Sequence, residues 1–378
     1  MFTLDRFRDD IQFLVNIDSG THCREGVNKL GRWFADRFSR IGWDIDWFEP
    51  APEYGKSFLA YSGDKNAFDL LILCHLDTVF PEGEAKARPF SEDQARMYGP
   101  GVADMKSGCL FTWYAIKELL DKGQLSGNVA VFYNGEHEIS CPHIRPVIEE
   151  LSQKAKAVIS AESARVNGAY VKQRKGIGRY RIEFHGKGAH AGNNPFEGEC
   201  AITEAAHWTL FLREFCDQDK GIYVNPGIIS GGMSQNSIPH FAELAIDTRF
   251  DALEEGERIE RLIREKAERP FNPQIKVQVK GKIMRPPMVP NARTEELCSS
   301  IEKIGERHGV DVHWAFAGGG SDASFASPFG IPTLCGLAAV GGKLHSKDEY
   351  LEKSDLEERY KVFRDIVLEI STNNPADI

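Results

Sequence analysis

The sequence predicts an α/β protein: a mostly parallel, doubly wound domain that carries an inserted ferredoxin-like α+β domain. Up to about residue 160, apolar strand-like runs alternate with helical stretches, the pattern of a parallel sheet covered by helices. From residue 175 the pattern changes, and after residue 286 it returns. We therefore expect the large domain at 1–174 and 287–378, with the insertion at 175–286.

The elements of the large domain follow from hydrophobic spacing. Residues 24–41 carry their apolar side chains on one stripe, as in an amphipathic helix. Residues 70–74 and 129–133 are continuously apolar, which is typical of strands buried on both faces. The other elements expected here are a helix at 107–121, strands at 157–160 and 331–337, a helix at 294–307 and a terminal helix.

The insertion begins with residues 179–185, whose alternation of polar and apolar residues predicts a half-exposed antiparallel strand. A helix at 199–216, strands at 222–230 and 242–250, a charged helix at 254–268 and a strand at 274–280 should follow. This order of strands and helices is the split ferredoxin-like unit. The Arg-Pro-Pro run at 285–287 is the expected hinge back to the large domain.

Composition excludes several classes of protein. The net charge of −10 without a long basic run argues against nucleic acid as a partner. The sequence contains no run of about 18 apolar residues, so we expect no membrane span. The start MFTLDRFRDD carries acidic residues and is not expected to be a signal peptide. Cysteines such as Cys74 and Cys335 lie in apolar runs, where a thiol packs as a small hydrophobic group. We expect a reduced, cytoplasmic protein.

Residues of metal-ligand type stand at five separate places in the chain. In a parallel sheet, ligands collect beyond the carboxyl ends of the strands, and His75, Glu138 and Glu162 each fall at the end of an expected strand. Asp77, two residues after His75, is placed to orient the imidazole of that ligand. Two imidazoles and three carboxylates suffice for two divalent metals that share a carboxylate, a site suited to attack of water on an amide. The five residues are His75, Asp104, Glu138, Glu162 and His345.

These residues and their flanking motifs resemble one family over nearly the whole chain. The motifs are HLDTV, GPGVADMK, an acidic pair after a strand and a late histidine. The family is that of the dinuclear-zinc hydrolases, which includes acetylornithine deacetylase, succinyl-diaminopimelate desuccinylase, aminoacylase and bacterial glutamate carboxypeptidase. The resemblance implies that Asp104 bridges two metal ions, that His75 and Glu162 complete one site, and that Glu138 and His345 complete the other. Zinc is the expected metal, and manganese or cobalt would suit the same ligands.

The acidic stretch departs from this family, in which it reads Asp-Glu-Glu with the first Glu as general base. Here it reads Glu136-His137-Glu138. A gapless match makes Glu138 the ligand and places His137 at the base position. A slip of one residue would make Glu136 the base and His137 a ligand. The chain is then a hydrolase with a histidine base, an enzyme with different chemistry at the same metals, or a metal-holding protein of low activity.

The insertion also carries residues that match the family. His190, in GAHAG, matches a histidine that reaches the partner subunit's site and polarises the scissile carbonyl. Asn236 and Arg249 match residues that contact the substrate and its carboxylate, to which an arginine fork is suited. Gly320 ends a glycine run whose backbone N–H groups can hold an anion. The resemblance also implies a homodimer formed through the inserted lid domain.

Taken together, the residues and the resemblance predict metal-dependent hydrolysis of an amide bond in a small substrate with a free carboxylate. N-acyl amino acid deacylases and small-peptide carboxypeptidases are enzymes of this type. The alternative is amide formation or another transfer at the same metals, because His137 replaces the usual glutamate.

Overall fold

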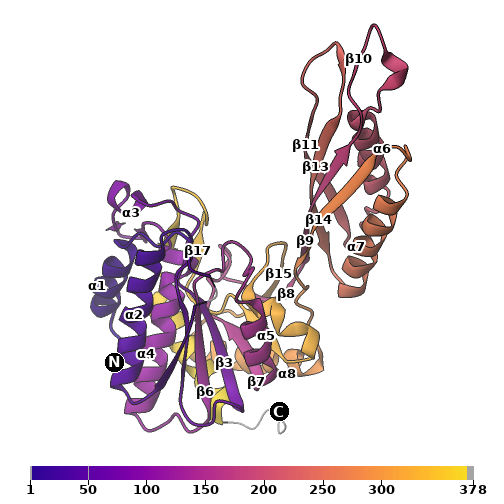
Figure 1. Ribbon diagram of the computed structural model, residues 1–378. Coiled ribbons are helices and arrows are strands. Elements are labelled where there is room, and N and C mark those ends of the chain that lie inside the picture. Colours follow the sequence, from indigo (N-terminus) through magenta and orange to yellow (C-terminus); the bar gives the residue numbers. More distant parts are fainter. Residues whose placement is uncertain (1, 50, 373–378) are drawn as a thin grey trace. The chain divides into compact units, whose positions relative to one another are not determined.

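The computed structural model describes residues 2–49 and 51–372 of the chain (Figure 1). The chain forms two compact units, which are described separately. The first comprises Met1–Gln173, Pro290–Ala317 and Ser321–Ile378, and the second comprises Arg174–Val289 and Gly318–Gly320. In the described part of the chain, no helix is both long and apolar enough to cross a membrane.

The first unit is built on an eight-stranded sheet whose middle strands, β6, β3, β7 and β16, run parallel. The expected mostly parallel α/β fold is therefore confirmed. The edge strands β1 and β2, and also β8 and β15, were not anticipated. In sheet order the strands are β1 (Asp44–Phe48), β2 (Ser57–Tyr61), β6 (Val129–Asn134), β3 (Phe68–His75), β7 (Ala155–Ser160), β16 (Thr333–Cys335), β8 (Tyr170–Arg174) and β15 (Trp314–Ala317).

A second, small sheet links two loops of the first unit. Its strands, in order, are β17 (Gly341–Gly342), β18 (Tyr350–Glu352), β5 (Arg96–Tyr98) and β4 (Ser91–Glu92). The pairing of Tyr350 with Tyr98 brings the segment before β18 beside the segment after β5. Because His345 and Asp104 lie in these two segments, this sheet joins parts of the site that are far apart in sequence.

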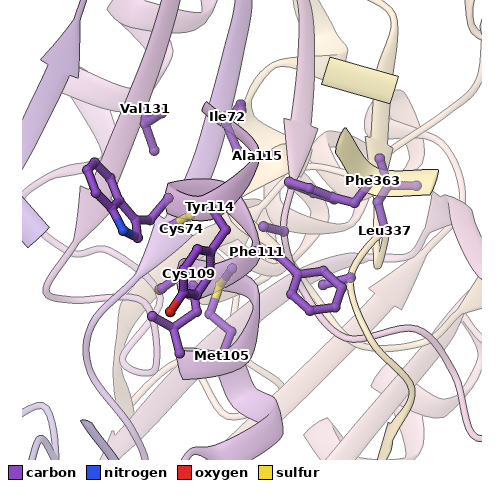
Figure 2. Close-up of a cluster of buried hydrophobic side chains, with 14 of the residues drawn as sticks. Ile72, Cys74, Met105, Cys109, Phe111, Tyr114, Ala115, Val131, Leu337 and Phe363 are labelled. Carbon is purple, nitrogen blue, oxygen red and sulfur yellow. The ribbon is translucent and has the colours of Figure 1, made fainter. Parts of the chain in front are cut away.

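Helix α4 lies at the centre of the first unit, in contact with β3 and α9. Its side chains are buried on nearly all sides, as expected for a helix that is apolar around its circumference. Figure 2 shows Phe111 and Ala115 of this helix among Ile72, Val131 and Phe363 of its neighbours. The helices are α1 (Leu4–Val15), α2 (Arg24–Arg40), α3 (Glu84–Ala87), α4 (Ser107–Asp121), α5 (Arg145–Gln153), α8 (Ala292–His308) and α9 (Leu356–Thr372). Of these, α1, α3 and α5 were not anticipated.

The second unit has the expected order of elements, strand-helix-strand-strand-helix-strand (Figure 1). Its antiparallel sheet has the order β11-β13-β9-β14, with α6 and α7 in contact with it. Trp208 and Phe184 pack in a core of their own. The elements are β9 (Gly176–His185), β10 (Ala189–His190), α6 (Ala201–Arg213), β11 (Tyr223–Gly231), β12 (Ser237–Ile238), β13 (Phe241–Phe250), α7 (Leu253–Glu268) and β14 (Lys276–Arg285).

The buried carboxylate of Glu118, in α4, contributes to the free energy of unfolding in a way that depends on pH. Glu118 accepts hydrogen bonds from Lys122 Nζ, Tyr360 Oη and Arg364 Nη1 at 2.6, 2.9 and 2.8 Å. Burial raises the pKa of Glu118, but these donors outweigh it and lower the pKa to about 2. Because the pKa is lowered on folding, the stabilisation is complete above about pH 4.5 and is lost as the pH falls toward 2.

We therefore expect Glu118→Gln to lower the free energy of unfolding at pH 7 by about 2 kcal/mol. The difference from the native protein should shrink between pH 4.5 and pH 3, and urea unfolding at several pH values measures it. Asp121→Asn, which removes an exposed acid of the same helix, is the control. A difference that does not change with pH would contradict the assignment.

Candidate metal centre

Three predicted ligands stand at the carboxyl ends of adjacent parallel strands. His75 is the last residue of β3, Glu138 follows β6, and Glu162 follows β7. The neighbouring strands end together, because His75 pairs with Asn134 and Leu73 pairs with Ser160. The sheet alone therefore gathers these three side chains at one edge.

Asp104 lies between two histidines that come from different parts of the fold. It stands in the segment Val102–Lys106, directly before α4. Its Oδ1 lies 3.0 Å from Nε2 of His75, and its Oδ2 lies 3.1 Å from Nε2 of His345. Glu162 Oε1 is 3.8 Å from His75 Nε2, and Glu138 Oε2 is 3.4 Å from His345 Nε2. The structure thus brings all five predicted ligands together, with Asp104 in the middle.

The charges of this cluster are those of a cation site. Although burial lowers the pKa of His75, the adjacent carboxylates raise it well above its usual value. The hydrogen bond to Asp104 raises the pKa of His345 to about 9. Burial raises the pKa of Glu138 far above its usual range, and its Oε1 accepts no hydrogen bond within the described residues. His75 and His345 therefore hold protons that offset the negative charge of the adjacent carboxylates. A bound cation could offset the same charge.

The donor set fits divalent metal ions. Two groups of ligand atoms each lie within 4.8 Å of one another: His75, His137 and Glu162, and His75, Asp104 and Glu138. Imidazole nitrogens and carboxylate oxygens are ligands of zinc, manganese and cobalt alike. The buried Glu138 oxygen without a hydrogen bond is the kind of atom that a metal ion would satisfy.

Asp77 supports the site in a different way from the one expected. The predicted contact of its carboxylate with His75 is long, with 3.6 Å between Nδ1 and Oδ1. Nδ1 instead lies 2.9 Å from the backbone oxygen of Asp77, which still orients the ring. The carboxylate accepts hydrogen bonds from Thr21 Oγ1 and from the backbone N–H groups of His137 and Glu138. It therefore holds the turn that carries Glu138.

The two candidate bases point in different directions. Oε2 of Glu136 accepts the backbone N–H groups of His143 and Ile144, and Oε1 lies 3.3 Å from Nδ1 of His143. His137 instead stacks on His75, with ring centroids 4.0 Å apart, and its Nε2 lies 3.6 Å from Glu162. Of the two, only His137 faces the ligand cluster.

Two acids that the sequence reasoning missed support the site. Glu349 accepts the backbone N–H groups of Gly101, Ala103 and Asp104 at 2.9–3.0 Å. Asp322 lies 2.9 Å from Nδ1 of His137. Glu349 lies four residues after His345, and Asp322 lies two residues after the glycine run. A buried acid needs a polar partner, so an acidic residue within a buried stretch of the sequence could have indicated a supporting role for each.

In the second unit, His190 lies in the short two-stranded sheet of β10 and β12, and Asn236 directly precedes β12. Nδ1 of His190 accepts the backbone N–H groups of Gly192 and Asn193 at 3.1 and 3.0 Å. A ring nitrogen that accepts carries no proton, so the proton lies on the exposed Nε2. The backbone oxygen of Asn236 accepts the N–H of Ala191, which ties the two segments together.

Arg249 is already engaged within the second unit. Its Nε and Nη2 donate to the carboxylate of Asp247 at 2.6 and 3.0 Å, and its Nη1 donates to the Gly318 oxygen. A guanidinium has five N–H groups, so two remain beyond these three bonds to described residues. Gly320 packs closely on Arg285, because a Cβ there would lie 2.4 Å from Cδ of that arginine.

Comparison with known proteins places this geometry in a family. Residues 71–369 match the family described as Peptidase family M20/M25/M40. Carboxypeptidase G2 of Pseudomonas sp. (strain RS-16) is 26% identical over 368 residues, which cover 95% of this chain and 88% of that protein. Succinyl-diaminopimelate desuccinylase of Gluconobacter oxydans is 28% identical over 312 residues, with 76% and 78% covered.

Solved structures show the same fold. A metallo-carboxypeptidase of the M20 family from Sulfolobus solfataricus has a TM-score of 0.74 at 17% identity, over 99% of this chain and 100% of that one. An aminopeptidase from Bacillus cereus has a TM-score of 0.76 at 20% identity, over 98% and 99% of the two chains. The family match spans most of the sequence and includes all five residues of the cluster. The chain therefore belongs to the peptidase family M20/M25/M40 and is a metal-dependent peptidase or amidohydrolase.

Proposed function

We propose that the protein hydrolyses an amide bond next to a free carboxylate in a small substrate, such as an N-acyl amino acid or a short peptide. The position of Asp104 carries this proposal, because each of its oxygens faces a different histidine at about 3 Å. A carboxylate so placed suits a bridge between two divalent ions. The relatives named for carboxypeptidase and desuccinylase activities support the same class of substrate.

In this proposal the cluster would hold two divalent ions, either zinc or, in its place, manganese or cobalt. His75 and Glu162 would hold one ion, Glu138 and His345 would hold the other, and Asp104 would be a ligand to both. When bound, the ions supply an activated water and polarise the carbonyl group of the substrate. The chain contributes the carboxylate ligands. Although burial raises the pKa of Asp104, the hydrogen bonds from His345 and His75 lower it well below its usual range, so this carboxylate is ionised and suited to a cation.

His137 accepts the proton of the attacking water at Nε2 and returns it to the leaving nitrogen. His190, with its proton on Nε2, donates a hydrogen bond to the carbonyl oxygen as negative charge develops there. Asn236 and the two remaining N–H groups of Arg249 hold the substrate carboxylate, and the backbone at Gly320 assists. Glu136 serves the turn at 143–144 and takes no part in this scheme.

We also propose a cytoplasmic homodimer formed through the second unit, in which His190 completes the partner's site. The strand β11 lies at the edge of its sheet and exposes Ile228 and Ile229, which are 65% and 56% accessible. Leu210 of the contacting helix α6 is 69% accessible. An apolar edge of this kind suits pairing with a second copy. All eight cysteines are free thiols, which suits a reducing compartment.

A zinc-supplemented hydrolysis panel of N-acyl amino acids and dipeptides tests the proposed reaction. We expect turnover of at least one substrate by the native protein, and a fall of at least about 100-fold for His137→Ala. His313→Ala, which removes an exposed histidine, is the matched control and should keep full activity. The rates are measured as amine release, with metal content determined in each sample.

Silence across the panel, with metals still bound, would sink hydrolysis and favour the alternative of amide formation or another transfer. The variant His137→Glu then separates the two readings. Hydrolysis that appears with glutamate would show that the scaffold supports hydrolysis and that the native histidine directs it elsewhere.

A further inference from the structure

Asp322 contacts the imidazole of His137, which faces the ligand cluster. It stands at the start of a short 3-10 helix (Asp322–Phe325) and is almost fully buried. Its Oδ1 lies 2.9 Å from Nδ1 of His137 and accepts from Cys141 Sγ at 3.1 Å. Its Oδ2 accepts from Asn134 Nδ2 at 2.7 Å.

The donors around Asp322 define its state. Asn134 Oδ1 accepts the backbone N–H of Glu136, so the amide must present its N–H to Asp322. The thiol of Cys141 also donates to Asp322, so both carboxylate oxygens act as acceptors. An ionised Asp322 has no proton to give, which would make Nδ1 of His137 the donor of the bond between them. In that state the proton would sit on Nδ1, and the lone pair of Nε2 would face the cluster.

The stacking of His137 on His75 decides what this lone pair can reach. The two rings are parallel to within 5°, with centroids 4.0 Å apart. A zinc ion binds an imidazole nitrogen in the ring plane, at about 2.1 Å. An ion in the plane of His75 would lie about 3.5 Å from the plane of His137, because stacked atoms do not approach more closely. In this arrangement His137 cannot share the ion of His75, although the distances alone group the two residues.

We propose that Asp322 is a positioning residue that makes His137 a base rather than a metal ligand. Asp322 fixes the tautomer with the proton on Nδ1 and aims Nε2 at the water that attacks the substrate. This inference rests on the proposed hydrolysis. It adds that Asp322 fixes the orientation of His137, which stands where the family has a glutamate. The base of this chain is then a buried aspartate–histidine pair, in which the proton moves to and from Nε2.

Nitrogen NMR of the zinc-loaded full chain, labelled in its histidines, tests the tautomer without any activity. The His137 signals are assigned by their loss in His137→Ala. We expect a protonated Nδ1 and an unprotonated Nε2 without the shift that metal coordination causes. A metal-shifted Nε2, or a proton on Nε2, would overturn the proposal.

Kinetics and metal content of Asp322→Asn provide the second readout. The amide keeps the size of the carboxylate but can present an N–H to Nδ1, which favours the wrong tautomer. We expect kcat to fall about 100-fold or more with KM nearly unchanged, and zinc content to equal that of the native protein. Cys141→Ala is the matched control: it removes a donor to the same oxygen and spares the contact with His137, so kcat should change by no more than about threefold.

The outcomes separate this inference from the proposed function. An inactive native protein with the expected NMR signature would reject hydrolysis and keep the positioning of His137. An active native protein whose Asp322→Asn variant loses zinc, or keeps its kcat, would reject the positioning role and keep hydrolysis.

Discussion

Replacing Asp104 with alanine should remove metal binding and activity together. The two oxygens of Asp104 face His75 and His345, so one substitution takes a ligand from both proposed ions and leaves the other buried carboxylates to repel each other. We expect kcat/KM to fall at least about 10⁴-fold, equivalent to about 5.5 kcal/mol of barrier. Metal content per chain should fall from about two ions to less than one, as measured by mass spectrometry of the desalted protein.

Asp104→Asn tests whether charge or size carries this effect. The amide has the shape of the carboxylate but lacks the charge and one of the oxygens, so we expect a loss nearly as large as for alanine. Asp64→Ala, at an exposed turn, is the control and should leave metal content and activity unchanged. Two ions per chain in Asp104→Ala would refute the bridging role.

Replacing Glu349 with alanine should destabilise the first unit and weaken metal binding. Three backbone N–H groups, of Gly101, Ala103 and Asp104, would lose their acceptor in a buried place. Each unsatisfied group costs about 1–3 kcal/mol, so we expect a loss of about 3–5 kcal/mol in the free energy of unfolding. Metal affinity should fall about 10–100-fold, because the segment that presents Asp104 loses its anchor. Urea unfolding and metal titration measure the two effects.

Glu349→Gln should have a smaller effect on stability than alanine. One amide oxygen can still accept the N–H groups of Ala103 and Asp104, which share Oε1 in the native protein. The N–H of Gly101 would then face an NH2 group. Glu352→Ala, which breaks the more exposed ion pair of Glu352 with Arg96, should cost less than about 1 kcal/mol. Equal losses for Gln and Ala at position 349 would show that the carboxylate is not the anchor.

The strand ends were the part of the site that the sequence could reveal. His75 and Glu162 follow continuously apolar runs, and such runs predict parallel strands whose carboxyl ends meet. The strand β1 was missed because it is exposed or half-exposed along its length, so its local pattern carries little signal of burial. The helix α5 was missed for a similar reason: only Ile148, Leu151 and Ser152 of its nine residues are buried.

The α/β class, the ligand types and the departure at position 137 could be read from the amino-acid sequence, because strand periodicity and motif spacing are local properties of the chain. How these residues are arranged depends on the folded chain. The small sheet brings His345 to Asp104 across 241 positions. The turn held by Asp77 directs His137 toward the ligand cluster and Glu136 toward the backbone of His143 and Ile144. The stack on His75 and the hydrogen bond to Asp322 depend on contacts between distant segments, which no local pattern encodes.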